Sequence, residues 1–284
     1  MKNSGKTLAA FSGRVGLEIA GFRLSLKSDA ISIISILKHR YSKFGSAVGA
    51  GFRLDVSEAP GRQNPFKPEV LFDGRSLEIK RGDFEAVLDM RAGAGTLKAA
   101  PNEQCLDAFL RSFISFLLIR SGGFMQHSAG LVKNGKAYLF LGKSGAGKST
   151  LAKLAAQGLA PHFGRLRKKC GAEVISDEIN LVRFEKGRFR VYGSPFWGEM
   201  RADGRQGSWP LGGIYLLNKA KLNKVRACTK GEALKLLLRC LVNFDKNPGT
   251  STLIMGNAVQ LISKAKFARL EFSKDNADFL SLIS

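Results

Sequence analysis

The chain contains the run Gly142-Lys143-Ser144-Gly145-Ala146-Gly147-Lys148-Ser149. Apolar residues 137–141 precede this run, and Leu151 and Leu154 follow it at helical spacing. The pattern predicts a strand, a glycine-rich turn and a helix, which is the context in which such a run binds phosphate. Glycines let several backbone N–H groups point at one phosphate chain, and the helix N-terminus adds a partial positive charge. We expect this loop to bind a nucleoside triphosphate.

The side chains of the loop predict a metal-assisted phosphate site. Lys148 would place a positive charge near the β- and γ-phosphates, and the Ser149 hydroxyl would coordinate Mg²⁺. ATP and Mg²⁺ are therefore the expected cofactors. The alternative, a glycine-rich turn that binds nothing, is disfavoured by the Lys-Ser pair and by both flanking elements. The predicted nucleotide-binding residues are Gly142, Lys143, Ser144, Gly145, Ala146, Gly147, Lys148, Ser149 and Thr150.

The composition is typical of a soluble globular protein. The chain has 284 residues, of which 44% are hydrophobic and 24% are charged, and this length suits one large or two modest domains. No apolar run is long enough to span a bilayer, and residues 1–13 lack the apolar stretch of a secretory signal. The four cysteines have no CxxC spacing, which favours reduced thiols. We expect a cytoplasmic protein with no membrane partner.

The net charge is unusual, because 45 basic and 23 acidic residues give +22. Such a field attracts polyanions of any kind. The basic residues are spread along the chain, with one local run at Arg165–Lys169, and no aromatic residues alternate with them there. A solvated basic surface and an anionic partner both remain open, while the sequence gives no specific reason to expect nucleic acid.

The first part of the chain predicts a β-rich domain over residues 1–100. Alternating apolar residues indicate strands, and Asp73-Gly74 is a two-residue hairpin signal. One helix is expected from Asp29, as its N-cap, through Arg40. The segment Gly93 to Pro101 reads as the boundary, so residues 101–284 would form a second domain that carries the glycine-rich loop.

The strand that enters the loop is predicted to be the second arm of an antiparallel hairpin. Ser128–Val132 and Ala137–Leu141 flank Asn134-Gly135, a strong hairpin signal. In Rossmann-like and Ras-like proteins this strand usually lies in a parallel sheet, so the hairpin favours an α/β fold of the α+β type with a mixed sheet. The other expected elements are a helix over Asn102–Arg120, a hairpin of Ile179–Phe184 with Phe189–Tyr192, a strand at Leu211–Leu217, a helix over Lys230–Val242 opened by a Thr229–Glu232 capping box, and a strand at Phe267–Phe272 before a C-terminal helix.

An apolar segment at residues 174–176 ends in Asp177 and Glu178. Carboxylates at the end of a strand near a phosphate loop suit Mg²⁺ coordination together with Ser149, and one of them could accept a proton from an attacking hydroxyl. An acidic surface turn is the alternative. An ABC-type ATPase is excluded, because the chain lacks both the Leu-Ser-Gly-Gly-Gln signature and a large helical region between the two motifs.

His127 precedes the first loop glycine by fifteen positions. Because a hairpin returns the chain on itself, His127 is expected near the loop end of the returning strand. A lone histidine is more often structural than catalytic, so both roles stay open at this point.

Together these residues resemble the HPr kinase/phosphorylase family, whose phosphate-loop core is similar to that of phosphoenolpyruvate carboxykinases. The family's histidine, loop lysine and loop serine match His127, Lys148 and Ser149, and its paired aspartates match Asp177 and, with a substitution, Glu178. The resemblance covers residues 103–284 and implies a P-loop core with a mixed sheet. It implies that Asp177 activates an acceptor serine and that His127 positions that carboxylate or the γ-phosphate.

Two departures bear on the activity. Thr150 stands where the family's loop has Glu, and Ser208-Trp209-Pro210 replaces charged residues tied to the reverse, phosphorylase reaction, which is therefore not expected. The chain more closely resembles the HPr-kinase-like proteins of peptide-modification (SynChlorMet-type) cassettes, through residues 127–130 and Gly193–Glu199. Glu199 is expected to close over the phosphates, and a packed turn is the alternative.

The resulting prediction is an ATP- and Mg²⁺-dependent kinase that phosphorylates a hydroxyl, serine by resemblance, on a small protein or peptide. A small-metabolite or carboxykinase-like enzyme and a nucleotide-regulated, non-catalytic protein of a peptide-maturation system remain as alternatives. The sequence leaves open whether the chain forms a homo-oligomer. The predicted catalytic residues are Asp177, Lys148, His127 and Glu199, and the predicted metal ligands are Ser149, Asp177 and Glu178.

Overall fold

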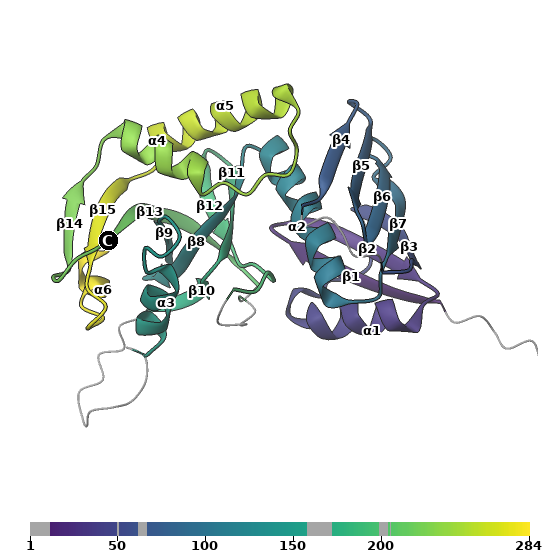
Figure 1. The fold of residues 1–284 in the computed structure, drawn as a ribbon, viewed down its shortest axis with the longest axis horizontal. Helices are drawn as coiled ribbons and strands as arrows, with labels where there is room; N and C mark the ends of the chain where they lie inside the picture. The colour runs from purple at the N-terminus through teal and green to yellow at the C-terminus, as the bar shows by residue number, and fades with distance from the viewer. Residues whose placement is uncertain (1–11, 50, 62–66, 158–171, 199–203, 205) are drawn as a thin grey trace, which may run out of the picture. The chain divides into compact units, whose positions relative to one another are not determined.

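The computed structural model describes residues 12–49, 51–61, 67–157, 172–198, 204 and 206–284. The chain divides into two compact units, Met1–Leu110 and Arg111–Ser284, and each carries its own mixed sheet with helices. The chain is therefore a mixed α/β protein (Figure 1). The predicted domains, 1–100 and 101–284, stay a prediction.

The N-terminal unit is built on a seven-stranded sheet in the order β1-β2-β3-β7-β6-β5-β4. Neighbouring strands are antiparallel, except that β3 runs parallel to both β2 and β7. Helix α1 (Ile31–Arg40) packs against β1 and β2 and buries Ile33, Ile34 and Leu37. The strands are β1 (Gly13–Ile19), β2 (Phe22–Ser28), β3 (Phe52–Glu58), β4 (Glu69–Phe72), β5 (Ser76–Arg81), β6 (Phe84–Asp89) and β7 (Ala94–Ala99), and a short helix η1 (Ser42–Phe44) follows α1.

The predicted hairpin around Asp73-Gly74 is confirmed, because β4 and β5 pair antiparallel with Phe72 opposite Leu77, and the Asp73 carboxylate accepts the N–H groups of Arg75 and Ser76 in the turn. Two other local predictions for this unit were wrong. The N-cap of α1 is Ala30, not Asp29, and it has no side-chain capping bond. The expected boundary segment Gly93 to Pro101 contains β7, which lies between β3 and β6 in the sheet.

The C-terminal unit is built on an eight-stranded mixed sheet, and the amphipathic helix α2 (Glu103–Arg120) leads into it. Its strands pair in a closed circuit, β8-β11-β12-β13-β9-β8, with β10, β15 and β14 attached. The strands are β8 (Phe124–Lys133), β9 (Lys136–Leu141), β10 (Ala172–Ser176), β11 (Ile179–Glu185), β12 (Arg188–Tyr192), β13 (Ser208–Lys219), β14 (Lys224–Ala227) and β15 (Phe267–Phe272), and the helices after α2 are α3 (Lys148–Gln157), α4 (Lys230–Arg239), α5 (Pro248–Lys264) and α6 (Phe279–Leu282).

The two predicted hairpins are confirmed. Strands β8 and β9 pair antiparallel around Asn134-Gly135, both of which have positive φ, as a tight turn between them requires. Strands β11 and β12 pair antiparallel around Lys186-Gly187. The other edge of β9 pairs in parallel with β13, so the strand that enters the glycine-rich loop has one antiparallel and one parallel neighbour.

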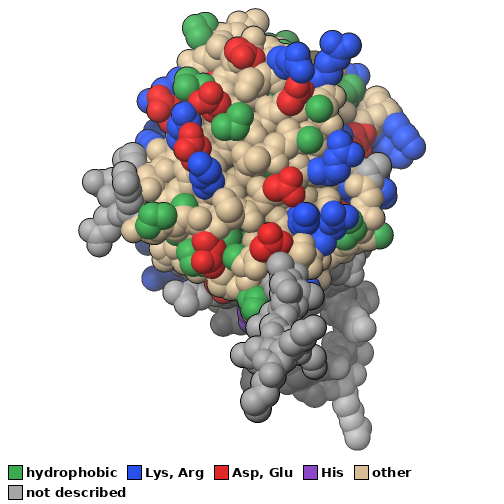
Figure 2. Space-filling model, turned by 90° about the vertical axis from the view of Figure 1, so that its right-hand side faces the viewer, with side chains coloured by type: hydrophobic (Ala, Val, Ile, Leu, Met, Phe, Trp, Pro, Cys, Tyr) green, Lys and Arg blue, Asp and Glu red, His purple; other side chains and the backbone are tan. Residues whose placement is uncertain are grey.

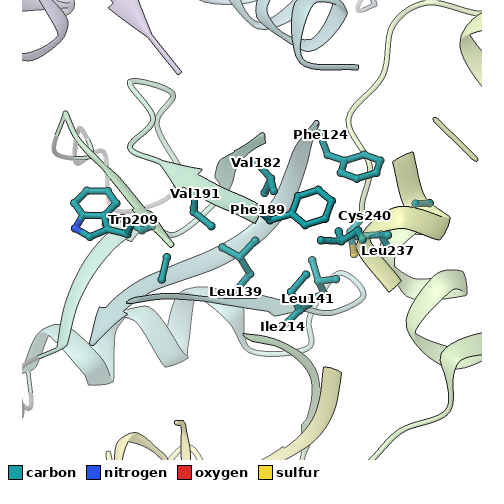
Figure 3. Packing of buried hydrophobic residues seen from close by; sticks show 14 of the residues in the cluster. Phe124, Leu139, Leu141, Val182, Phe189, Val191, Trp209, Ile214, Leu237 and Cys240 are labelled. Carbon is teal, nitrogen blue, oxygen red and sulfur yellow. The ribbon is translucent and has the colours of Figure 1, made fainter. Parts of the chain in front are cut away.

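Helices cover both faces of the C-terminal sheet, with α4 and α5 on one face and α3 and α6 on the other (Figure 1). Strand β9 alternates between the two cores, as a strand with two buried faces must. Leu139 and Leu141 pack with the α4 and α5 side, where Figure 3 shows them beside Ile214, Leu237 and Cys240. Tyr138 and Phe140, which alternate with them, pack with α3 and α6. The glycine-rich loop therefore starts from a strand that is buried on both faces.

The helices after β13 agree only in part with those predicted from the sequence. The Thr229–Glu232 capping box opens α4 as predicted, but the helix ends at Arg239, short of the expected Val242. Helix α5 was not predicted, although Asn247 as N-cap and Pro248 at the first helical position are typical of a helix start.

The sequence also predicts no membrane-spanning segment and reduced cysteines. None of the helices in the described ranges is long and apolar enough to cross a membrane. Cys105, Cys228 and Cys240 are free thiols, and Cys170 lies outside the described residues.

Candidate functional site

The glycine-rich loop connects β9 to α3 through a tight backbone path. Gly145 and Gly147 have φ of 74° and 100°, in the left-handed region that favours glycine. A Cβ on Gly142 would come within 2.6 Å of the Ala146 side chain, so glycine is required there for close packing. Helix α3 then begins at Lys148, and its N-terminus faces the loop. The predicted order of strand, turn and helix is thus present.

Lys148 is held inside this loop and is only 7% exposed. Its Nζ donates hydrogen bonds to the carbonyl oxygens of Gly142, at 3.0 Å, and Lys143, at 3.4 Å. Burial lowers the pKa of this ammonium group, while Cys240 and Glu178 act in the opposite direction. A nearly buried cation has little competition from water for an anion that enters the loop.

The second wall of the site is the turn between β10 and β11, which carries Asp177 and Glu178. The Ser176 hydroxyl accepts the N–H groups of Glu178, at 3.2 Å, and Ile179, at 3.0 Å, and so fixes the turn. Asp177 is only 5% exposed. A Cβ on Gly198 would come within 2.6 Å of its Oδ1, so the glycine backbone lies directly against the carboxylate.

Arg111 of α2 supports the same turn, and sequence reasoning missed it. Its Nη1 lies 3.7 Å from Glu178 Oε1, and its Nη2 donates to the Trp197 carbonyl at 3.1 Å. Its guanidinium carbon lies 5.3 Å from the centre of the Phe196 ring. Arg111 thus connects the acidic turn to the segment that ends at Gly198. No local pattern in the sequence marks an arginine on an apolar helix for this role.

His127 of β8 lies between the two walls, and its side chain is partly exposed and partly buried. It pairs with Ile179 of β11, next to the acidic turn, and its backbone N–H donates to the Cys240 carbonyl at 2.8 Å. Burial of its ring, with smaller effects from Lys148 and Arg111, lowers the pKa of the imidazole. The histidine is therefore neutral near pH 7 and can act as a hydrogen-bond donor and acceptor.

A single pocket of about 470 Å³ brings these groups together. It contains the predicted histidine, both predicted carboxylates and the second half of the predicted loop. Glu199 lies outside the described residues, so the structure does not test its predicted role. The pocket is lined by His127, Ser144, Gly145, Gly147, Lys148, Ser149, Thr150, Asp177, Glu178 and Lys219.

Lys219 is the pocket residue that the sequence analysis did not identify. It is the last residue of β13, which runs parallel to β9 with Leu216 opposite Leu141. Parallel neighbours end at the same edge of a sheet, so Lys219 lies beside the glycine-rich loop. The available signal was a lysine that follows the apolar run 214–217 after one intervening residue.

The oxygen atoms in the pocket suit a hard divalent cation. Ser149, Asp177 and Glu178 supply a hydroxyl and two carboxylates, and Mg²⁺ is commonly held by one or two carboxylates together with ligand phosphates. Within the described ranges, no group of three or more His, Cys, Asp or Glu could hold a metal by itself. The donor set therefore fits Mg²⁺ that arrives with a phosphate ligand, not a protein-only metal site.

The face drawn in Figure 2 shows no extended patch of basic side chains. Lys and Arg side chains there are interspersed with Asp and Glu, and apolar side chains are scattered singly. The basic side chains on this face are therefore not gathered into a surface that would follow a polyanion.

Comparison with solved structures finds distant structural likenesses. The Hpr(Ser) kinase/phosphatase from Coxiella burnetii aligns with 48% of this chain and 87% of its own, at 11% sequence identity and a TM-score of 0.23. A likeness this weak carries no argument about family or activity. No protein-family model matches the chain, and the search of curated proteins found no match.

Proposed function

We propose that the chain is an ATP- and Mg²⁺-dependent phosphotransferase. The observation that carries this proposal is the 470 Å³ pocket, which has Lys148 and the glycine-rich loop together with Asp177, Glu178 and His127 in its lining. A nucleotide-binding protein without catalysis needs only the loop. Two carboxylates and a neutral histidine in the same pocket are the additional groups that phosphoryl transfer uses.

The residues of the chain have separate roles in this proposal. Lys148 and the loop amides hold the triphosphate. Ser149 and the acidic turn would hold Mg²⁺, which would neutralise phosphate charge when bound. Asp177 accepts the proton of the acceptor hydroxyl as that oxygen attacks the γ-phosphorus, and ADP leaves. The proton thus ends on the carboxylate and the phosphoryl group on the acceptor. His127 orients the carboxylate or the γ-phosphate.

The proposed acceptor is a serine hydroxyl on a small protein or peptide. Support comes from two motif resemblances. His127, the loop and the Asp177-Glu178 pair resemble the HPr kinase/phosphorylase family, and residues 127–130 with Gly193–Glu199 resemble the HPr-kinase-like proteins of peptide-modification cassettes. The acidic turn can be reached from solvent, because Glu178 is a third exposed and Asp177, although only 5% exposed, lines the same pocket. An acceptor carried on a peptide can therefore reach the acidic turn.

Transfer from γ-labelled ATP tests the proposal. The wild-type chain with Mg²⁺ is expected to label a serine-containing peptide faster than it releases labelled phosphate to water. Asp177→Asn should keep ATP affinity and lose about 100-fold or more in transfer, the usual size of a general-base contribution. Glu178→Gln, beside Arg111, is the matched variant and should lose less. ATP binding without transfer to a peptide or small hydroxyl compound would leave only a nucleotide-binding protein.

A further inference from the structure

Two more hollows adjoin the glycine-rich loop, on different sides of β13. The first, the β15 hollow, has a volume of about 450 Å³ and is lined by Gly147, Thr150, Lys219, Ala220, Lys221, Phe272, Lys274 and Asp275. The second, the α4 hollow, has a volume of about 560 Å³. It runs along residues 142–146 and reaches Asn218, Lys219, Leu236 and the Arg269–Glu232 ion pair. Neither hollow contains His127, Asp177 or Glu178.

The direction of a bound triphosphate distinguishes the two hollows. Its γ-phosphate must face the acidic turn, while its α- and β-phosphates lie on the loop amides and the N-terminus of α3. The nucleoside then leaves the pocket on the side of the helix start, away from Asp177. Thr150 is in the first turn of α3, and together with Gly147 and Lys219 it lines both the phosphate pocket and the β15 hollow. The α4 hollow also shares residues with the phosphate pocket, namely Ser144, Gly145 and Lys219, but it contains neither Gly147 nor Thr150 and lies along the start of the loop.

The β15 hollow has the chemistry that a nucleoside needs. The apolar lining consists of Ala220, which is exposed, and Phe272, which is 2% exposed and so offers little surface, while Lys221, Lys274 and Asp275 are polar and exposed. The Phe272 ring lies under the loop, because a Cβ on Gly147 would be 3.3 Å from it. The volume of about 450 Å³ falls in the range of small-molecule sites, which combine an apolar lining with a few polar groups.

We propose that the β15 hollow is the nucleoside subsite of the pocket, and that Lys219 bridges the nucleoside and phosphate parts of the ligand. This inference rests on the proposed function. Phe272 and Ala220 contact the base or sugar, and Lys219, which lines both spaces, contacts the phosphate that joins them.

Two tryptophan variants on neighbouring positions test the assignment. Ala220 lines only the β15 hollow and Asn218 only the α4 hollow, and both are exposed, so either can be enlarged without filling the core. Isothermal titration with ATP and with inorganic tripolyphosphate separates the nucleoside from the phosphate chain. Ala220→Trp should weaken ATP at least about tenfold and leave tripolyphosphate within about twofold. Asn218→Trp should change neither affinity.

The other outcomes overturn the assignment in distinguishable ways. Unchanged ATP affinity in Ala220→Trp, or weakened ATP affinity in Asn218→Trp, would place the nucleoside elsewhere. Equal weakening of ATP and tripolyphosphate in Ala220→Trp would mean that the substitution disturbs the loop and that the hollow is not a subsite. A wild-type chain that binds neither ligand would refute the proposed function itself. Ala220→Val replaces the tryptophan variant if that variant fails to fold.

Discussion

The two walls of the pocket are built in different ways. The loop wall is one continuous segment, Gly142–Thr150, and its central hydrogen bonds run from Lys148 back to the carbonyls of Gly142 and Lys143. The acidic wall depends on residues distant in sequence, because Asp177 lies against Gly198 and Glu178 lies beside Arg111. Changes in the loop wall should therefore act on ligand binding directly, whereas the acidic wall can be disturbed through residues that touch no ligand.

The largest expected effect is in the loop wall. Lys148→Ala should weaken ATP binding by at least about 100-fold, since a charge pair at ~4 Å is worth roughly 4 kcal/mol near a protein surface. Isothermal titration measures the affinity, and circular dichroism shows whether the fold is retained. Lys153→Ala, on the exposed side of the same helix, is the matched control and should bind like the wild type. Near-normal ATP affinity in Lys148→Ala would show that the loop wall does not hold the phosphates.

An intermediate effect is expected from the acidic wall. The added methyl in Gly198→Ala would meet the Asp177 carboxylate at 2.6 Å, so the carboxylate or the segment must move. Turnover should fall about tenfold or more and stability by about 1–3 kcal/mol, as for other overpacked sites, while ATP affinity stays near normal. Gly231→Ala, with no atom within 4 Å of its Cβ, is the control. Unchanged turnover in Gly198→Ala would show that catalysis does not depend on the position of the Asp177 carboxylate.

The smallest effect concerns His127, between the walls. Because burial lowers the pKa of its imidazole below the usual 6.5, the unfolded chain binds a proton more readily than the folded one. The stability of the wild type should therefore fall, relative to His127→Gln, as the pH drops through about 6.5. Urea unfolding of both proteins at pH 8 and pH 5.5 measures this difference. Parallel losses in the two proteins would mean that His127 titrates as it does in the unfolded chain.

The parts of the structure that local chemistry determines could be predicted. The Asn134-Gly135 turn, the Thr229–Glu232 capping box and the glycines of the loop each depend on a few adjacent residues. Pairing of β8 with β9 then follows from the turn, which brings His127 to the loop edge. The carboxylates at the end of β10 were placed correctly because they directly follow an apolar strand.

The missed features depend on tertiary packing. Strand β7 contains two alanines, a glycine and a lysine, so its sequence carries a weak strand signal, and its place between β3 and β6 comes from the sheet. Arg111 and Lys219 join the site only because α2 and β13 approach the acidic turn and the loop. The spacing of residues along the sequence does not indicate such tertiary contacts. Arg111 and Lys219 were therefore found only in the structure.

One strand sets the separation of the two walls. Strand β8 pairs with the end of β9 through Ser128 and Leu141, and with the start of β11 through His127 and Ile179. The Ser128 N–H also donates to the Glu178 carbonyl at 2.8 Å, and Asn180 donates to the Ser128 carbonyl at 2.7 Å. Spacing between the phosphate cradle and the proton acceptor is thus fixed by main-chain ladders. The pocket cannot widen unless hydrogen bonds of the sheet break. A change of acceptor would therefore require substitutions of side chains at the opening of the pocket.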